Sequence, residues 1–327
     1  MARRIVIITP ALSDANDGNW QTARRWAGFL ERRYDVAIAR DWDSAPADAM
    51  IALHARRSAA AIERFAASGG PLAVVLTGTD LYRDIRTDAS AQRSLALAQR
   101  LVVLQECGVE ELAAPLRGKT EVIYQSARTL APGRPRRRSF DLLLVGHLRA
   151  EKDPMTALRA LQALPPGERG YARLRLVHVG DDKDALVGAR FREAAAAEPR
   201  VELHGRLPHA GTRQLIRRGR VLLLPSLMEG GANVLIEAVT ASVPVLASRI
   251  GGSVGMLGPD YDGYFPVGNA AALAELIRRC QEEPGFLDHL AGQCARRAPL
   301  FAPARERAAV QRLAHNLLRQ EFSGAPE

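Results

Sequence analysis

Short apolar runs alternate with helix-period segments along the first part of the chain. Apolar runs that end in polar clusters are typical of buried strands, and apolar positions three and four apart are typical of amphipathic helices. Strands are predicted over 4–9, 34–39, 50–55, 72–76, 101–104 and 121–124, and helices over 20–30, 59–67 and 89–98. Such alternation predicts a parallel sheet with helices on both faces.

The same alternation resumes after a basic, proline-rich segment. The residues Ala-Pro-Gly-Arg-Pro-Arg-Arg-Arg at 131–138 show no periodicity, so we predict a domain boundary there. Further strands are predicted over 140–145, 173–179, 201–204, 221–224 and 243–247. The sequence predicts an α/β protein with two doubly wound, Rossmann-like domains. The predicted parts are a first domain at 1–127, a linker at 128–139, a second domain at 140–300 and a C-terminal helical segment at 301–327.

One stretch, Pro-Ser-Leu-Met-Glu-Gly-Gly-Ala-Asn-Val-Leu-Ile-Glu, lies between two of these apolar runs and is typical of a loop followed by a helix. Gly230 and Gly231 allow a ligand to approach the backbone closely. A helix that starts near Ala232 directs unpaired N–H groups and its positive dipole end toward an anion. Glu229 and Glu237 supply carboxylates that accept hydrogen bonds from paired hydroxyls. The stretch therefore suits a sugar linked to phosphate.

Polar residues follow several predicted strands of the first domain. His54, Arg56 and Arg57 follow one strand, and Thr77-Gly-Thr-Asp80 with Arg83 follows the next. The carboxyl ends of parallel strands meet at one edge of a sheet, where doubly wound proteins bind ligands. We expect an anion pocket at this edge.

The turn-rich loop Ser-Asp-Ala-Asn-Asp-Gly-Asn lies between the first strand and the first helix. Its position at the ligand-binding edge makes Gly18 and Asn19 candidates for contacting the transferred sugar or the acceptor. A helix cap is the alternative role for these residues.

Composition and length favour a soluble two-domain protein. The 327 residues are 47% hydrophobic, enough for two cores, and no segment approaches the roughly 20 apolar residues of a membrane helix. The apolar run near the start is too short for a signal peptide. The three cysteines form no C-x-x-C pair and no metal-ligand group with histidine, so we expect the reduced cytoplasm.

The formal charge of +9 raises the question of nucleic acid or an anionic membrane surface. Arginine pairs recur along the whole chain, at 24–25, 32–33, 56–57, 217–218, 278–279 and 296–297. This spread disfavours a nucleic-acid groove, which concentrates charge with interleaved aromatic residues. The charge therefore identifies no partner, and we predict no binding of nucleic acid.

Glu229 and Glu237, with seven residues between them, follow a strand ending Leu-Pro-Ser and precede Pro-Val-Leu-Ala-Ser. This arrangement resembles the E-x7-E signature of retaining nucleotide-sugar glycosyltransferases with the GT-B fold, and the resemblance covers essentially the whole chain. It implies that Glu237 holds the ribose hydroxyls and Glu229 those of the transferred sugar. It also implies that the terminal helix packs back on the first domain.

The segment Gly-His-Leu-Arg-Ala-Glu-Lys that ends at Lys152 is similar to the family pattern G-R-L-x-x-x-K, whose basic residues hold the donor diphosphate. Lys152 matches the pattern. His147 occupies the position of the family arginine, and Arg149, two positions later, is a second source of positive charge.

Two further segments resemble parts of the family. His-Gly-Arg-Leu-Pro at 204–208 is similar to the loop that meets the nucleotide base, which makes Arg206 and Leu207 candidate donor contacts. The residues Thr77-Gly-Thr-Asp80 resemble an H-G-T-D segment in which threonine replaces the histidine. An acceptor that is already an anion needs orientation and charge neutralisation rather than a base, so this replacement favours an anionic acceptor.

The segments around these residues, taken together, resemble the selenosugar synthases of bacterial selenoneine biosynthesis. The resemblance implies transfer of a sugar from UDP-N-acetylglucosamine or UDP-glucose to selenophosphate, with formation of a carbon–selenium bond. It also implies a selenophosphate synthetase and a selenoneine synthase as neighbours in the pathway. We expect no metal cofactor, because no D-x-D motif occurs in the matching strand context.

The resemblance assigns roles to individual residues. Lys152 and Arg149, with the backbone N–H groups at 231–233, are expected to stabilise charge on the departing UDP. The candidate catalytic residues are Lys152, Arg149 and Glu229. The candidate donor-binding residues are Gly18, His147, Arg149, Lys152, Arg206, Leu207, Glu229, Gly230, Gly231, Ala232, Asn233 and Glu237. The candidate acceptor-binding residues are Asn19, His54, Thr77, Thr79, Asp80 and Arg83.

Two alternatives remain open from the sequence. The first is a GT-B glycosyltransferase with another acceptor, a lipid or a small thiol, whose basic helices bind an anionic membrane surface. The second is a non-catalytic protein that binds nucleotide sugars or, through its arginines, nucleic acid.

Overall fold

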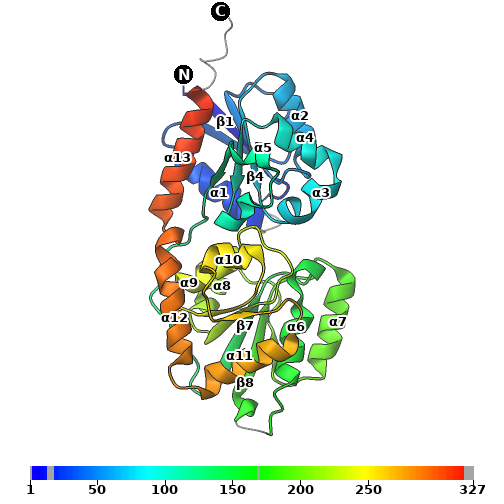
Figure 1. The fold of residues 1–327 in the computed structure, drawn as a ribbon, viewed down its shortest axis with the longest axis vertical. Coiled ribbons are helices and arrows are strands. Elements are labelled where there is room, and N and C mark those ends of the chain that lie inside the picture. The colour runs from blue at the N-terminus through cyan, green and yellow to red at the C-terminus, as the bar shows by residue number, and fades with distance from the viewer. Residues whose placement is uncertain (1, 13–17, 168–169, 320–327) are drawn as a thin grey trace, which may run out of the picture. The chain divides into compact units, whose positions relative to one another are not determined.

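The computed structural model describes residues 2–12, 18–167 and 170–319, and these form two compact units (Figure 1). The first unit contains the chain up to Ser126, the short segment Glu229–Gly231 and the chain from Pro303 onward. The second contains Ala127–Met228 and Ala232–Ala302.

A six-stranded parallel sheet forms the centre of the first unit, in the order β2-β1-β3-β4-β5-β6. Its strands are β1 (Arg4–Ile8), β2 (Asp35–Ala39), β3 (Ala49–Leu53), β4 (Leu72–Leu76), β5 (Arg100–Val103) and β6 (Thr120–Val122). Its helices are α1 (Gly18–Leu30), α2 (Ala59–Ala67), α3 (Ile85–Thr87), α4 (Ala89–Leu97), α5 (Ala114–Arg117) and α13 (Pro303–Arg319). The central strands β3 and β4 are buried along their whole length because both faces are covered.

The two faces of this sheet carry separate hydrophobic cores. Alternate residues of β3 point to opposite faces, as the pleat requires. Ile51 packs in one core with Trp26 of α1 and Leu313 of α13. Met50 packs in the other core with Phe65 of α2. Helix α13, near the C-terminus, therefore completes the core of a unit built mainly from the start of the chain.

Glu306 of α13 joins three parts of the first unit through one buried carboxylate. Its side chain accepts hydrogen bonds from Trp26 Nε1 (2.8 Å), Arg25 Nε (2.7 Å) and Ser126 Oγ (2.5 Å), and the residue is 1% exposed. A buried charge is tolerated when it is paired and its oxygens accept hydrogen bonds, as here. This contact fixes α13 against α1.

The second unit has its own six-stranded parallel sheet, in the order β12-β11-β10-β7-β8-β9. Its strands are β7 (Phe140–Val145), β8 (Leu174–Val179), β9 (Val201–Leu203), β10 (Val221–Leu224), β11 (Val245–Ser248) and β12 (Tyr264–Phe265). Its helices are α6 (Pro154–Gln162), α7 (Ala185–Ala196), α8 (His209–Ile216), α9 (Asn233–Val239), α10 (Gly251–Leu257), α11 (Ala270–Glu282) and α12 (Phe286–Arg297). Two parallel sheets with flanking helices confirm the predicted fold class.

The segment expected to link the domains, 128–139, makes hydrogen bonds with the second unit. The N–H of Leu130 donates to the Thr240 carbonyl (3.1 Å), and that of Gly133 donates to the Arg217 carbonyl (2.9 Å). The division between the units falls after Ser126. Residues 128–139, which their proline- and arginine-rich composition marked as a linker, thus belong to the second unit, and backbone hydrogen bonds hold them there.

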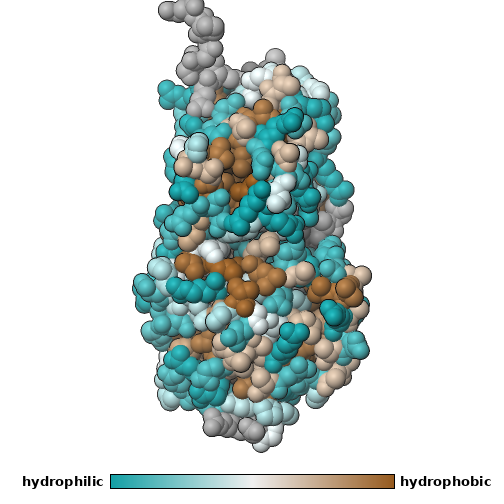
Figure 2. Space-filling model, turned by 45° about the vertical axis from the view of Figure 1, so that its right-hand side comes forward, coloured by the Kyte–Doolittle hydropathy of each residue, from teal (hydrophilic) through white to brown (hydrophobic). Residues whose placement is uncertain are grey.

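The surface is mainly polar on the face shown in Figure 2. Hydrophilic residues predominate there, and hydrophobic ones form separated groups. The exposed large hydrophobic residues within the described ranges are Leu186, Leu203, Leu227 and Val267. None of the helices in the described part of the chain has the length and apolar character needed to cross a membrane.

We predict that Glu306→Ala destabilises the first unit by about 3 kcal/mol, because it leaves buried donors without their acceptor. Thermal or urea unfolding followed by the fluorescence of Trp26 and the other tryptophans measures the change. Glu31→Ala, which removes an exposed glutamate of the same unit, is the matched control and should change stability by less than about 0.5 kcal/mol. Equal stability of the two variants would contradict the role assigned to Glu306.

Candidate functional site

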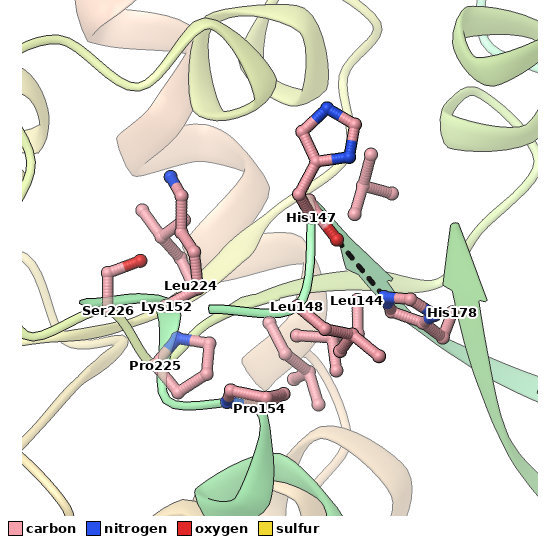
Figure 3. Close-up of a pocket in the computed structure, with 12 residues that line it drawn as sticks. Leu144, His147, Leu148, Lys152, Pro154, His178, Leu224, Pro225 and Ser226 are labelled. Carbon is pink, nitrogen blue, oxygen red and sulfur yellow. Dashed lines mark hydrogen bonds between the residues drawn. The ribbon is translucent and has the colours of Figure 1, made fainter. Parts of the chain in front are cut away.

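A pocket opens in the second unit beyond the carboxyl ends of β7 and β10 (Figure 3). Ligands bind at this edge in doubly wound sheets. The residues that line the pocket include Gly146, His147, Lys152, His178, Pro225 and Ser226. Segments 146–152 and 225–226, which the sequence singled out separately, thus meet in one pocket.

The loop after β7 is held by the residues that follow β8. The N–H of Leu148 donates to the Asp181 carbonyl (2.8 Å), and the N–H of Lys183 donates to the Leu148 carbonyl (3.0 Å). Gly180 allows this approach, because a Cβ at this position would lie 2.0 Å from the Gly146 carbonyl oxygen. The two loops therefore act as one structural element.

Two histidines fix the start of this loop. The backbone N–H of Asp181 donates to His147 Nδ1 (3.0 Å), so the ring proton of His147 lies on Nε2. His178 Nε2 donates to the Gly146 carbonyl (3.0 Å), the dashed line in Figure 3. Burial lowers the pKa of His178, which keeps this ring neutral at pH 7. His147 therefore presents an N–H donor at the position where the resembled pattern G-R-L-x-x-x-K has arginine.

Lys152 and Arg149 bring positive charge to the same loop. Lys152 ends the short helical turn Ala150–Lys152, which is tied to the segment after β10 because the Leu227 N–H donates to the Glu151 carbonyl (2.9 Å). The Nε of Arg149 is buried and has no hydrogen-bond partner within the described residues. A buried donor without an acceptor is costly, so Arg149 is suited to an anion that supplies one.

Glu237 is paired with a histidine that the sequence reasoning missed. Glu237 lies in α9 and is 9% exposed, and His209, the first residue of α8, donates from Nε2 to its Oε1 (2.5 Å). Glu237 is not among the residues that line the pocket of Figure 3. A ribose bound by Glu237 competes with His209 for the same oxygen. The sequence offered no signal for this pair beyond the position of His209 directly after the 204–208 segment.

The other donor candidates of the second unit lie in loops or at a helix start. Arg206 Nη1 lies 3.9 Å from Asp181 Oδ2, which places it beside the loop that holds His147. Leu207 and Asn233 are half-buried, and Ala232 is buried and precedes α9.

Glu229, Gly230 and Gly231 group with the first unit. A Cβ at Gly230 would lie 2.4 Å from the Thr77 carbonyl carbon, and one at Gly231 would lie 2.7 Å from Leu104 Cβ. Both glycines are therefore required by close contacts within the chain, independently of any ligand. Glu229 is 8% exposed. Its predicted contact with a sugar stays a prediction.

The polar residues that follow β3 and β4 come together, as expected from their positions at adjacent strand ends. His54 is 3% exposed, and its Nε2 donates to Thr79 Oγ1 (3.1 Å). The Asp80 carboxylate is fully buried and accepts the backbone N–H groups of Ala55 (3.0 Å), Thr77 (3.0 Å) and Gly78 (2.8 Å). Asp80 therefore orders the loop, and its predicted contact with an acceptor stays a prediction.

Asp84, which the sequence reasoning did not single out, organises two arginines near His54. Its carboxylate, in a residue 4% exposed, accepts from Arg56 Nε (2.9 Å) and Arg83 Nε (3.2 Å). The Arg56 and Arg83 side chains are 42% and 50% exposed. The edge of the first sheet thus holds two partly exposed guanidinium groups in defined positions, and the expected anion pocket stays a prediction.

Gly18 and Asn19 begin α1. The Gly18 carbonyl accepts a hydrogen bond from Thr22 Oγ1 (2.8 Å), and Asn19 is half-buried. The rest of the loop that precedes them, residues 13–17, lies outside the described residues. Their contact with a donor sugar or an acceptor stays a prediction.

The comparisons with known proteins identify the class. The family model "Glycosyl transferases group 1" matches residues 131–298, and the chain belongs to this family. The matched residues cover the pocket of Figure 3, Glu229 and Glu237. The GT-B expectation from the E-x7-E pattern is confirmed at the level of family and fold.

Two curated relatives show how far sequence similarity extends. A D-inositol 3-phosphate glycosyltransferase of Streptomyces avermitilis is 28% identical over 265 residues, which cover 79% of this chain and 49% of that protein. The gpi3 subunit of a Schizosaccharomyces pombe phosphatidylinositol N-acetylglucosaminyltransferase is 32% identical over 82 residues, covering 25% of this chain and 18% of that protein. The chain thus spans about half or less of the length of these relatives.

Solved structures match the whole fold. HepE of Anabaena, solved in complex with UDP, has a TM-score of 0.74 at 17% identity, covering 97% of this chain and 100% of that one. A sucrose-phosphate synthase of Thermosynechococcus elongatus has a TM-score of 0.75 at 17% identity, covering 99% of this chain and 100% of that one. At this identity the likeness establishes the fold.

The described residues contain no group of three or more His, Cys, Asp or Glu side chains arranged to hold a metal ion. The expectation that the reaction requires no metal stays a prediction.

We predict that Gly180→Ala destabilises the second unit by about 3 kcal/mol, because the new Cβ meets the backbone of the loop after β7. Unfolding followed by circular dichroism measures the loss. The matched control is Gly292→Ala in α12, where a Cβ meets nothing within 4 Å, and it should stabilise the helix by about 0.5–1 kcal/mol. A Gly180→Ala protein as stable as the parent would show that the two loops are not coupled in this way.

Proposed function

We propose that the protein transfers a sugar from a UDP-sugar, UDP-N-acetylglucosamine or UDP-glucose, to selenophosphate and so forms a carbon–selenium bond. The observation that carries the acceptor half of the proposal is the edge of the first sheet, where Asp84 positions Arg56 and Arg83 beside His54. This edge is suited to an anion.

The donor half rests on the family and on the chemistry of the second unit. Related folds have been solved with UDP, and the E-x7-E glutamates lie within the family match. The loop that ends at Lys152 carries a lysine, the His147 N–H donor and the unsatisfied Arg149 Nε. Donors of this kind stabilise the negative charge that develops on a departing diphosphate.

The acceptor half rests on charge and on the state of the nearby titratable groups. The pKa of His54 is lowered by burial, and the Asp80 carboxylate is occupied by backbone N–H groups. An alcohol needs a base at the moment of attack, whereas selenophosphate already carries a nucleophilic anion. The residues at this edge therefore support an anionic acceptor.

In the proposed step, selenium of selenophosphate attacks the anomeric carbon. The carbon–selenium bond forms as the bond from that carbon to the UDP oxygen breaks, and UDP leaves with the electron pair. The phosphate group remains on selenium until water hydrolyses the selenium–phosphorus bond.

The proposal predicts that UDP release from UDP-glucose or UDP-N-acetylglucosamine depends on selenophosphate. A coupled UDP assay under anaerobic conditions, with inorganic phosphate as the control acceptor, measures it. Rapid UDP release without selenophosphate, or none with it, would overturn the proposal.

We predict that Glu237→Ala weakens UDP binding by about 10-fold to 150-fold, because it removes a charge-assisted hydrogen bond worth about 1.5–3 kcal/mol. Isothermal titration calorimetry of UDP measures the change. Glu193→Ala, an exposed glutamate of the second unit, is the control and should leave UDP affinity unchanged. Unchanged affinity in Glu237→Ala would remove this residue from the donor site.

Lys152→Ala is predicted to lower kcat by about 100-fold to 1000-fold with each UDP-sugar tested, because it removes a charge that stabilises the departing diphosphate. Lys183→Ala, an exposed lysine of the same unit, is the control. Loss of activity with only one UDP-sugar would instead assign Lys152 to recognition of the sugar.

A second candidate is a glycosyltransferase with another small-molecule or lipid acceptor. The curated relatives favour it, since their names specify inositol phosphate and phosphatidylinositol. An acceptor hydroxyl requires a base, and UDP release driven by such an alcohol but not by selenophosphate would select this candidate.

A further inference from the structure

His54 adopts a backbone conformation that is uncommon for its residue type. It follows β3 with φ of 74°, in the left-handed region that glycine and asparagine adopt most readily. Non-glycine residues persist there when the surrounding structure imposes the conformation, and such positions cluster at functional sites. The contacts of the His54 side chain show what the conformation achieves.

These contacts determine the His54 tautomer. The backbone N–H of Arg57 donates to Nδ1 (3.3 Å), so Nδ1 carries no proton. The proton lies on Nε2, which donates it to Thr79 Oγ1 (3.1 Å). Burial lowers the pKa of His54, and nearby Arg57 lowers it further, while Asp80 acts in the opposite direction. The ring is therefore neutral at pH 7 and acts as a donor toward Thr79.

The hydrogen bond from His54 orients the Thr79 hydroxyl. Because Oγ1 accepts from His54, the proton of the hydroxyl points in another direction. The loop that carries Thr79 is fixed by Asp80, whose carboxylate holds the N–H groups of Thr77 and Gly78. Thr79 is half-buried, so its hydroxyl is a positioned donor at the carboxyl edge of the sheet.

Two arginines are linked to His54 through the Asp84 carboxylate. His54 Nε2 lies 4.0 Å from Asp84 Oδ2, and the same carboxylate accepts from Arg56 Nε and Arg83 Nε. A hydroxyl donor and two guanidinium groups at the same edge of the sheet match the oxygens of a tetrahedral oxyanion such as a phosphate group.

We propose that His54 is a positioning residue that directs the Thr79 hydroxyl toward the phosphate-type oxyanion of the acceptor, between Arg56 and Arg83. The inference rests on the proposed function and deepens it, because it names the part of the acceptor that the first unit recognises. His54 acts through Thr79 and takes no proton from the acceptor.

The arrangement has a consequence for pH. Protonation puts a proton on Nδ1 and breaks the hydrogen bond from the Arg57 N–H. The charged groups that face His54 are Asp80, Asp84, Arg56 and Arg57. Since the pKa of His54 lies below its ordinary value of 6.5, the ring is neutral at pH 7, and the Nε2 proton that Thr79 accepts is kept when the ring protonates at lower pH.

The test compares His54→Asn and Thr79→Val with the parent. Asparagine tolerates the left-handed backbone and lacks the Nε2 donor, and valine keeps the shape of threonine without its hydroxyl. Each variant should raise the KM for selenophosphate by about tenfold, with UDP affinity unchanged. The double variant should raise KM no further, because both changes remove one interaction. Thr79→Ser, which keeps the hydroxyl group, should have the same KM as the parent.

Binding of inorganic phosphate to the full chain, saturated with UDP and followed by calorimetry, separates the inference from the proposed function. If selenophosphate is no substrate but phosphate binding weakens in His54→Asn and Thr79→Val alike, the inference holds and the proposed function fails. If turnover occurs while both variants keep the parent KM, or if their effects add in the double variant, the inference fails.

Discussion

Beyond the carboxyl ends of the parallel strands, backbone N–H and carbonyl groups have no hydrogen-bond partner in the sheet. The structure of both candidate sites depends on which groups form hydrogen bonds with them. Buried N–H and carbonyl groups must be paired, and polar side chains supply partners at the strand ends that carry the candidate sites. In the first unit Asp80 accepts three backbone N–H groups, and in the second His178 donates to the Gly146 carbonyl. These buried groups hold Thr79 in one unit and His147 in the other in defined positions.

In the proposed function, the two units have different chemical tasks, and each task depends on the loops at the carboxyl ends of its strands. The second unit concentrates donors at the loop between Gly146 and Lys152, which suits a diphosphate whose charge increases as it leaves. The first unit presents guanidinium groups that Asp84 positions, together with a neutral histidine, which suits an anionic nucleophile.

The sequence predicted much of the fold because both parallel sheets are buried on two faces. Their strands are continuous apolar runs, and the alternation with helices fixes the parallel arrangement. The short strand β12 was not predicted, because two residues carry no pattern. The linker at 128–139 was predicted from its composition. Composition contains no information about hydrogen bonds, so the bonds of this segment to the rest of the second unit were not predicted.

The candidate site was predicted less completely, because local motifs specify chemistry but not pairing. Lys152, Glu229 and Glu237 were proposed from their resemblance to family motifs. His209 and Asp84 act through contacts with residues far away in the sequence, Glu237 and Arg56. His178 lies in an apolar strand, where a lone histidine has the pattern of a core residue. Gly230 and Gly231 were interpreted as making room for a ligand, and close approach within the first unit also requires them.

The most direct test of the central claim is the connectivity of the product. The protein is incubated anaerobically with selenophosphate and a UDP-sugar that carries ¹³C at the anomeric carbon, and the product is analysed by mass spectrometry and NMR. The account predicts a sugar with the selenium isotope pattern and a one-bond coupling between ¹³C and ⁷⁷Se at the anomeric position. A product whose labelled carbon is bonded to oxygen and which contains no selenium would contradict it.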